Sequence, residues 1–246
     1  MTRHTFSLSS ATLALLLIAG PLGANAQTPP PAPSPEGPRI VVTYVDVVPA
    51  SEAQAVALLK AYRDASRREE GNRSAEIWQQ QQPRGRFVVV EEWRDESARQ
   101  KHRESAQVTQ FLEKLKPLRI TAYDERTHTV YAVASPGNVP ADAVLVVTHV
   151  DVVPTGLPKA REFLSAQVEV SRKQMGNLRF DVLQGARMNH FTVLEAWRDE
   201  RAREAHISAA HTKTYREVLR ETAVDGAPPR GACAARGATA TAGCPP

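Results

Sequence analysis

Cysteine is nearly absent from this chain of 246 residues, and methionine and aromatic residues are scarce as well. The two cysteines, Cys233 and Cys244, both lie close to the C-terminal end, where an exported chain could join them across a short loop. Such a disulfide would cross-link no folded element, so its contribution to stability should be small. No histidine pattern accompanies the cysteines, and we therefore expect neither a metal site nor a cysteine nucleophile.

The chain also lacks an apolar run long enough to span a bilayer, which takes about 20 residues. The apolar stretch Leu13–Ile18 follows a weakly basic start at Arg3 and precedes an A-x-A cleavage pattern at 24–26. This order is typical of a secretory signal peptide, predicted over residues 1–26, with an uncleaved membrane anchor as the alternative. We expect a periplasmic or secreted protein whose mature chain begins at Gln27, with no membrane partner.

Charge of one sign is not in excess: the net charge is +4, and basic and acidic residues are mixed, as in Arg198–Arg201. This pattern indicates a solvated face and not a surface that tracks phosphates, so nucleic acid is not an expected partner. Residues 27–38 are rich in proline and predict an extended linker. Residues 225–246 contain no large apolar residue and predict a disordered tail.

What the chain does contain is one pattern that occurs twice. Val41–Pro49 returns as Val146–Pro154 with one difference, 105 residues later, and Phe87–Glu96 returns as Phe191–Glu200, 104 residues later. A period near 100 residues is the length of a small domain and is too long for a solenoid unit. The chain therefore predicts two copies of one domain. The predicted boundaries are 39–134 for repeat 1, 135–142 for a linker and 143–224 for repeat 2.

Each copy follows the same order of predicted elements. A strand with alternating apolar residues comes first, followed by an amphipathic helix, two strands and a second helix. Ser51 predicts a capping box for the first helix of repeat 1, and Gly71 and Gly176 are expected to end the first helices. The other predicted strands are 75–80, 86–93, Ile120–Tyr123 and Thr129–Val133 in repeat 1, and 178–184 and 190–197 in repeat 2. Since only Thr222–Val224 follows the last helix of repeat 2, that copy is expected to lack its final strand.

The order β-α-β-β-α-β is the ferredoxin-like arrangement, so the chain predicts an α+β fold. Two helices cover one face of such a sheet, while the other face is apolar and needs a partner. Two ferredoxin-like repeats in one chain can supply that partner to each other, packed sheet to sheet as an intrachain α+β barrel. We therefore expect a monomer that is built like a dimer.

One group of residues recurs in both copies and resembles a known family. Each copy has a Gly-Asn pair before its second strand, a Glu-x-Trp strand end, and a histidine nine residues after the tryptophan. This combination resembles the antibiotic biosynthesis monooxygenase (ABM) domain, and the resemblance covers about residues 39–133 and 143–224. The residues that carry it are Gly71-Asn72, Glu91 to Trp93 and His102 in repeat 1, and Gly176-Asn177, Glu195 to Trp197 and His206 in repeat 2.

The resemblance implies a fold and an activity. Family members usually pair through their open sheets, so a tandem chain looks like that dimer made covalent. Family enzymes oxidise phenols or quinols with molecular oxygen, without metal, flavin or other cofactor, so the implied partner is a small aromatic molecule. The substrate would lie between sheet and helices, and the protein would deprotonate it and stabilise the anion. Haem binding, known in relatives of similar fold, is not expected here.

The resemblance and the repeat together select candidate residues. Repeat 2 has more groups that titrate near neutral pH, because His149 and His211 stand where repeat 1 has Tyr44 and Gln107. The candidate catalytic residues are His206, His149, Asn177 and Trp197. The candidate substrate-binding residues are Tyr44, Asn72, Trp93, His102 and His211.

Each candidate also has a structural explanation. The tryptophans share the register of apolar strand residues, which favours core packing. The helical histidines can serve as hydrogen-bond partners of buried glutamates, and asparagine after glycine is favoured by turn chemistry. A second hypothesis therefore stands beside the enzyme: a non-catalytic ligand-binding or stress-related module that retains the fold. Oxygen uptake with an aromatic substrate discriminates between the two.

Overall fold

The computed structural model describes residues 36–80, 82–134 and 139–222, and the backbone of 233–237. The predicted signal peptide lies outside these residues, as do most of the proline-rich segment and part of the predicted linker at 135–142. Within the described part, no helix is long and apolar enough to cross a membrane.

The two copies have the same order of elements. Proline-containing 3₁₀ turns, Pro49–Ser51 and Pro154–Gly156, precede the first helix of each copy. Repeat 1 consists of β1 (Arg39–Asp46), α1 (Glu52–Ser66), β2 (Asn72–Gln80), β3 (Arg86–Trp93), α2 (Glu96–Arg103), α3 (Ala106–Leu115) and β4 (Asp124–Ala132). Repeat 2 consists of β5 (Val144–Asp151), α4 (Leu157–Arg172), β6 (Asn177–Gln184), β7 (His190–Trp197), α5 (Glu200–Ser208), α6 (Ala210–Thr222) and β8 (Cys233–Gly237).

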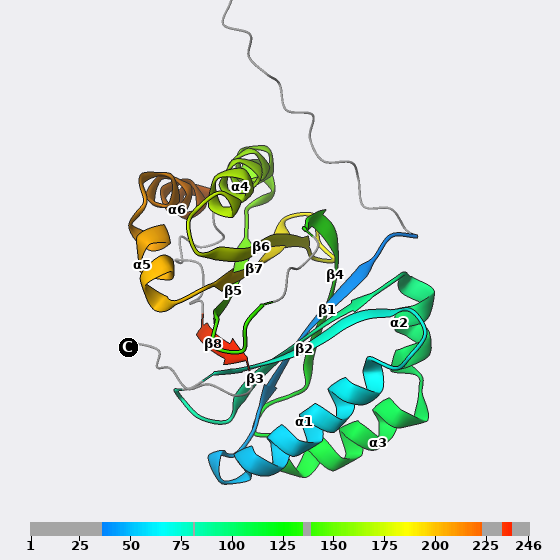
Figure 1. The fold of residues 1–246 in the computed structure, drawn as a ribbon. Coiled ribbons are helices and arrows are strands. Elements are labelled where there is room, and N and C mark those ends of the chain that lie inside the picture. Colours follow the sequence, from blue (N-terminus) through cyan, green and yellow to red (C-terminus); the bar gives the residue numbers. More distant parts are fainter. Residues whose placement is uncertain (1–35, 81, 135–138, 223–232, 238–246) are drawn as a thin grey trace, which may run out of the picture.

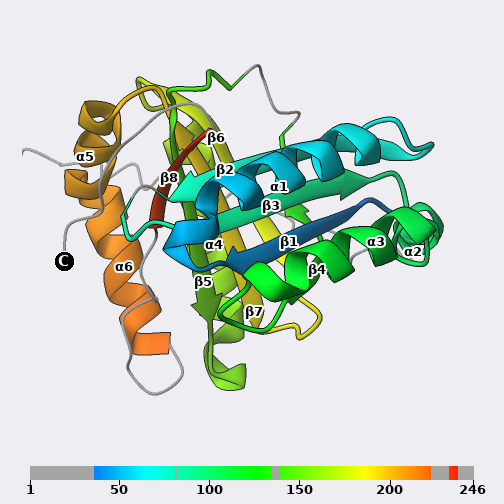
Figure 2. The same cartoon turned by 90° about the horizontal axis from the view of Figure 1, so that it is seen from below.

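All of these strands form one closed barrel in the order β1-β3-β2-β8-β5-β7-β6-β4. β4 pairs with β1 of its own copy and with β6 of the other, and β8 pairs with β5 and with β2 in the same way. The helices of repeat 1 and of repeat 2 cover opposite sides of the barrel (Figures 1 and 2). The predicted α+β fold, with two ferredoxin-like repeats packed sheet to sheet, is therefore confirmed.

The expectation that repeat 2 lacks its last strand is wrong. Cys233–Gly237, in the segment predicted to be a disordered tail, forms β8 and closes the barrel between β2 and β5. Apart from Arg236 the residues are small, and none is β-branched or aromatic, so the sequence gave no strand signal. The pairing comes instead from two neighbouring strand edges that would otherwise leave their backbone groups unpaired. The rest of the predicted tail lies outside the described residues.

Alternation along the strands divides the core into layers, as predicted for β1. Val45 and Val47 pack under the helices of repeat 1, whereas Ile40 and Val42 point into the barrel. The barrel interior is one cluster from both copies, formed by Ile40, Val42, Trp78, Val90, Leu145, Val147, Leu183, Leu194 and Ala196. Burial of this shared apolar surface holds the copies together, at roughly 25 cal/mol for each Å² removed from water.

An ion-pair network spans the two copies inside the barrel. The guanidinium of Arg179 on β6 lies 2.6 Å from Asp181 and 3.2 Å from Glu76 on β2. Arg179 and Asp181 are both buried and need compensation, which Glu76 adds for Arg179 and Arg172, at 3.4 Å, adds for Asp181.

Several local predictions need correction. The side chain of Ser51 makes no capping hydrogen bond, because the 3₁₀ turn already leads the chain into α1. The second helix of each copy is broken in two, and Ser105 caps α3 after the break. The two strand-like runs at 120–123 and 129–133 are replaced by the single strand β4.

The paired glycines act in turns and do not end helices. α1 ends at Ser66, five residues before Gly71, which adopts a φ of +88° where the chain enters β2. Gly176 adopts +87° at the same place in repeat 2. Asp95 and Asp199 cap the second helix of each copy, since each accepts a hydrogen bond from a backbone N–H in the first turn, at 2.8 Å.

Candidate functional site

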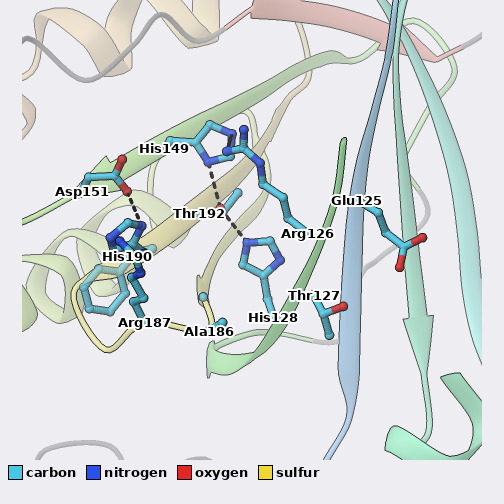
Figure 3. A pocket seen from close by; sticks show the side chains of 12 residues that line it. Glu125, Arg126, Thr127, His128, His149, Asp151, Ala186, Arg187, His190 and Thr192 are labelled. Atoms are coloured by element: carbon cyan, nitrogen blue, oxygen red, sulfur yellow. Dashed lines mark hydrogen bonds and ion pairs between the residues drawn. The ribbon is translucent and has the colours of Figure 1, made fainter. Parts of the chain in front are cut away.

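A pocket of about 420 Å³ lies where the two copies meet, at one end of the barrel. It exists because β4 pairs with β6 only from Thr129 onwards, so the first half of β4 extends beyond the end of β6. The lining residues come from both copies: 125–128 of β4, His149 and Asp151 of β5, and 185–187 and 190–192 of the β6–β7 hairpin. Figure 3 shows Arg126, His128, His149 and Thr192 facing one another, with Glu125 and Thr127 pointing away from them.

His149 lies at the centre of a hydrogen-bonded group in this pocket. Its Nε2 is 2.7 Å from the hydroxyl of Tyr44 and 3.1 Å from Nη1 of Arg126. Tyr44 and His149 occupy the same position in the two repeats, so equivalent residues of β1 and β5 meet inside the barrel. Arg126 also lies over the Tyr44 ring, 5.1 Å from its centroid, and pairs with Asp124 at 2.6 Å.

The other imidazole nitrogen of His149 leads to a second histidine. Nδ1 of His149 is 3.1 Å from Oγ1 of Thr192, and the same oxygen is 2.9 Å from Nε2 of His128 (Figure 3). Thr192 and His128 are both buried. The pocket therefore contains two linked histidines, one from each copy.

Burial determines the charge of these histidines. It lowers the pKa of His149 to about 4, with a further contribution from the neighbouring Arg126 cation. Burial also lowers the pKa of His128 to about 4. Both imidazoles are neutral at pH 7, so Arg126 provides the positive charge beside them.

The rim of the pocket is polar. His190 Nδ1 lies 3.1 Å from a carboxylate oxygen of Asp151. Thr192 and Phe191 follow His190 on β7, with Thr192 towards the pocket and Phe191 in the core under the helices.

The predicted residues Trp93 and His102 lie elsewhere, in the layer between sheet and helices of repeat 1. Their rings stack with centroids 4.4 Å apart, and both side chains are buried. His102 is held on one side by the Tyr62 hydroxyl at 2.8 Å and on the other by Glu69 at 2.9 Å. Burial raises the pKa of Glu91, whose carboxylate accepts a hydrogen bond from Tyr62.

Trp197 and His206 take the same place in repeat 2, with ring centroids 4.5 Å apart. Their partners differ from those in repeat 1: Nδ1 of His206 contacts Gln174 at 2.5 Å, and the Trp197 indole donates to Glu195 at 2.8 Å. Burial lowers the pKa of His206 to about 3, helped by the nearby His211. This site is buried and is not part of the pocket.

The predicted asparagines lie at the start of β2 and β6, beside a β-bulge in each copy. Asn177 donates to the carbonyl of Arg179 at 3.1 Å, which is a turn role. Nδ2 of Asn72 is buried and makes no hydrogen bond within the described residues.

Of the predicted site residues, the structure brings Tyr44 and His149 together at the pocket and leaves the others in or beside the two sheet–helix layers. Sequence reasoning missed Arg126, His128 and Thr192. One signal was available for β4, because Asp124, Arg126 and His128 alternate along the sequence and so lie on one face of a strand. Charged side chains on the inner face of a barrel are uncommon and therefore indicate a functional site. No group of three or more metal-ligating side chains occurs in the described ranges.

The model of the antibiotic biosynthesis monooxygenase family matches residues 38–114 and 143–218, which together are more than half of the chain. The chain belongs to the ABM family. One matched segment lies in each repeat, as expected for a tandem two-copy chain. No curated protein matches the ABM chain in sequence.

Among solved structures, a "putative monooxygenase" from Fusobacterium nucleatum has a TM-score of 0.70 at 17% identity, covering 82% of this chain and 91% of its own. An anthrone oxidase-like protein has a TM-score of 0.65 at 15% identity, covering 85% and 96%. A "putative monooxygenase" from Lactobacillus acidophilus has a TM-score of 0.62 at 13% identity, covering 81% and 92%. These likenesses extend over both copies and show a shared fold.

Proposed function

We propose that this ABM protein is a monooxygenase that oxidises a small aromatic or quinol substrate with molecular oxygen, and that its site is the pocket between the two copies. The observation that carries the proposal is the neutral His149 beside the Arg126 cation in a cavity of about 420 Å³. A cavity of this size suits a small ligand of two or three rings.

The side chains suit the removal of a phenolic proton. A substrate hydroxyl would replace the Tyr44 hydroxyl as donor to Nε2 of His149, and Arg126 would stabilise the phenolate charge. An electron-rich anion can then reduce oxygen itself. The balance closes without another reductant: a phenol and O₂ give a para-quinone and water, with all four electrons supplied by the substrate.

Oxygen uptake tests this proposal. An electrode assay would screen phenols, naphthols and anthrones with the mature protein. For any substrate that is consumed, His149→Phe should lower turnover by roughly 10²-fold or more, as loss of a general base does. His206→Gln is the matched control, because His206 lies in the buried layer of the same repeat. Full turnover by His149→Phe would refute the assignment of the site.

A non-catalytic binding module is the second candidate, and one observation favours it. With a pKa of about 4, His149 is a weak base in the free protein. Two results together would support the module over the enzyme. The wild type would bind an aromatic ligand tightly without oxygen uptake, and Arg126→Gln would abolish that binding.

We also propose that the mature chain is exported and acts as a monomer. Export rests on the signal-peptide pattern of residues 1–26, and N-terminal sequencing of the mature protein should begin at Gln27. Monomeric behaviour rests on the closed barrel, in which each sheet already has its partner. Light scattering at low micromolar concentration should give the mass of one chain, and a dimer mass would contradict it.

A further inference from the structure

The contacts of His149 identify which of its nitrogens carries the proton. Nε2 faces both Nη1 of Arg126 and the hydroxyl of Tyr44. A guanidinium can only donate hydrogen bonds, so a proton on Nε2 would place two N–H groups against each other at 3.1 Å. Nε2 is therefore the acceptor, and Tyr44 donates to it as well.

The direction of the remaining hydrogen bonds follows from this assignment. A neutral imidazole with a bare Nε2 carries its proton on Nδ1, which then donates to Oγ1 of Thr192 at 3.1 Å. A threonine hydroxyl has a single proton. With its oxygen already accepting, that proton points to Nε2 of His128 at 2.9 Å. Every group from Tyr44 to His128 thus donates in the same direction.

We propose that Arg126 fixes His149 in the Nδ1–H tautomer, and that Thr192 and His128 are positioning residues that provide an outlet for the proton that His149 receives. The catalytic part of this inference rests on the proposed function, whereas the tautomer does not. When a hydroxyl of the bound molecule gives its proton to Nε2 of His149, the Nδ1 proton passes to Oγ1 of Thr192. The proton of Thr192 passes to Nε2 of His128 in the same step.

The result of that step is an imidazolium at His128 and a neutral His149 whose new Nε2–H donates to the anion just formed, which also accepts from Arg126. The protons balance across the step. The bound molecule loses one proton, His128 gains one, and His149 and Thr192 each gain one and lose one. The advantage is electrostatic: an imidazolium at His149 would lie 3.1 Å from Arg126, whereas the relay moves the charge to the far side of Thr192.

The equivalent positions on β8, β1 and β3 do not repeat this arrangement. The position of His149 is taken by Tyr44 and that of Thr192 by Val88. In the strand pairing, Cys233 and Ala235 of β8 occupy the positions that Arg126 and His128 occupy in β4. Among the described residues the relay therefore occurs once, built from residues of both copies at the pocket.

Nitrogen-15 NMR of histidine-labelled protein at pH 7 tests the inference without any substrate, with His149→Gln used to assign the signal. The expected result is an unprotonated Nε2 and a protonated Nδ1 at His149. Arg126→Met, which removes the guanidinium donor at Nε2, should shift His149 towards a mixture of tautomers, and Arg126→Lys, which keeps a donor there, should retain the wild-type state. A protonated Nε2 in the wild type, or unchanged signals in Arg126→Met, would overturn the assignment.

The catalytic part has its own readout for any substrate found by oxygen uptake. Thr192→Val should lower kcat by about 10-fold or more with little change in KM, the cost typical of losing an outer partner that orients a histidine. Thr192→Ser should recover most of the rate. If the tautomer is as expected but kcat is unchanged in Thr192→Val, the relay is refuted while the proposed function stands.

Discussion

The two copies in this chain share a backbone but differ in the polar chemistry built on it. In both sheet–helix layers a tryptophan stacks on a histidine in the same way, at 4.4 and 4.5 Å between centroids. The partners of the histidine differ, however, since His102 contacts Glu69 whereas His206 contacts Gln174. The stacked ring pair is common to both copies and is part of the fold, whereas the polar residues that contact the histidine differ between the copies.

Equivalent positions inside the barrel differ further. Those on β4, β5 and β7 hold two linked histidines and an arginine around a pocket, whereas the equivalent register positions on β1, β3 and β8 hold Tyr44, Val88, Cys233 and Ala235. A duplicated domain needs its core in both copies but a site only once. This comparison indicates that repeated residues report on the fold, while residues that break the repeat report on the site.

The largest effect we expect concerns a feature that both copies share. Gly71→Ala and Gly176→Ala should each destabilise the protein by about 3 kcal/mol, because alanine is strained at positive φ and overpacks its neighbour. The added Cβ would lie 2.6 Å from Cβ of Ala98 in repeat 1 and 2.5 Å from Cβ of Ala202 in repeat 2. Urea unfolding measures the two losses.

Double variants separate the two causes. Adding Ala98→Gly to Gly71→Ala, or Ala202→Gly to Gly176→Ala, removes the clash and leaves the backbone strain. Each double variant should recover part of the loss once the cost of the new glycine, measured alone, is subtracted. If only one of Gly71→Ala and Gly176→Ala lowered the free energy of unfolding, the two repeats would differ in fold as well as in chemistry.

The next effect is specific to repeat 2 and depends on pH. The folded-state pKa of His206, about 3, lies below its ordinary value of 6.5, so the unfolded chain binds more protons between these values. Wild-type stability should therefore fall on acidification below pH 6.5, by about 1.4 kcal/mol per pH unit for this one group. His206→Gln should lose that part of the slope.

The measurement is the free energy of unfolding between pH 6.5 and 4. His128 and His149 contribute slopes of the same sign in both proteins, so the informative quantity is the difference between the two curves. Lys173→Gln, on the exposed surface near Gln174, is the control and should run parallel to the wild type. Parallel curves for His206→Gln would show that His206 is not held neutral.

The smallest effect we expect is a difference in stability loss between substitutions of the two tryptophans. The indole N–H of Trp197 donates to Glu195 at 2.8 Å, whereas that of Trp93 is buried without a partner within the described residues. Trp197→Phe should therefore cost about 1 kcal/mol more than Trp93→Phe, since it leaves a buried carboxyl group with one donor fewer. Thermal unfolding of the two variants measures the difference, and equal losses would contradict the assigned roles.

The sequence predicted the fold well because a repeat doubles every signal. β3 and β7 have the predicted bounds, and the alternation along β1 correctly divided its inward and outward faces. β8 was missed because small residues carry no strand pattern, and only the open edges of two distant strands specify it.

The site was only partly predictable for a related reason. The difference between Tyr44 and His149 was visible in the repeat, and the two residues do meet. Arg126 and His128 have no matching segment to be compared with, since β4 and β8 share no sequence pattern. Their proximity to Thr192 depends on β4 crossing to the other copy, which follows from barrel closure and not from local sequence.

The most direct test of the account is to locate an aromatic ligand among the histidines. The mature protein would be titrated with 2-naphthol while NMR follows the imidazole C–H signals. We predict that the signals of His149, His128 and His190 shift with saturation, and that those of His102 and His206 do not. Shifts confined to His102 or His206 would place the ligand between sheet and helices and contradict the account, as would the absence of any shift.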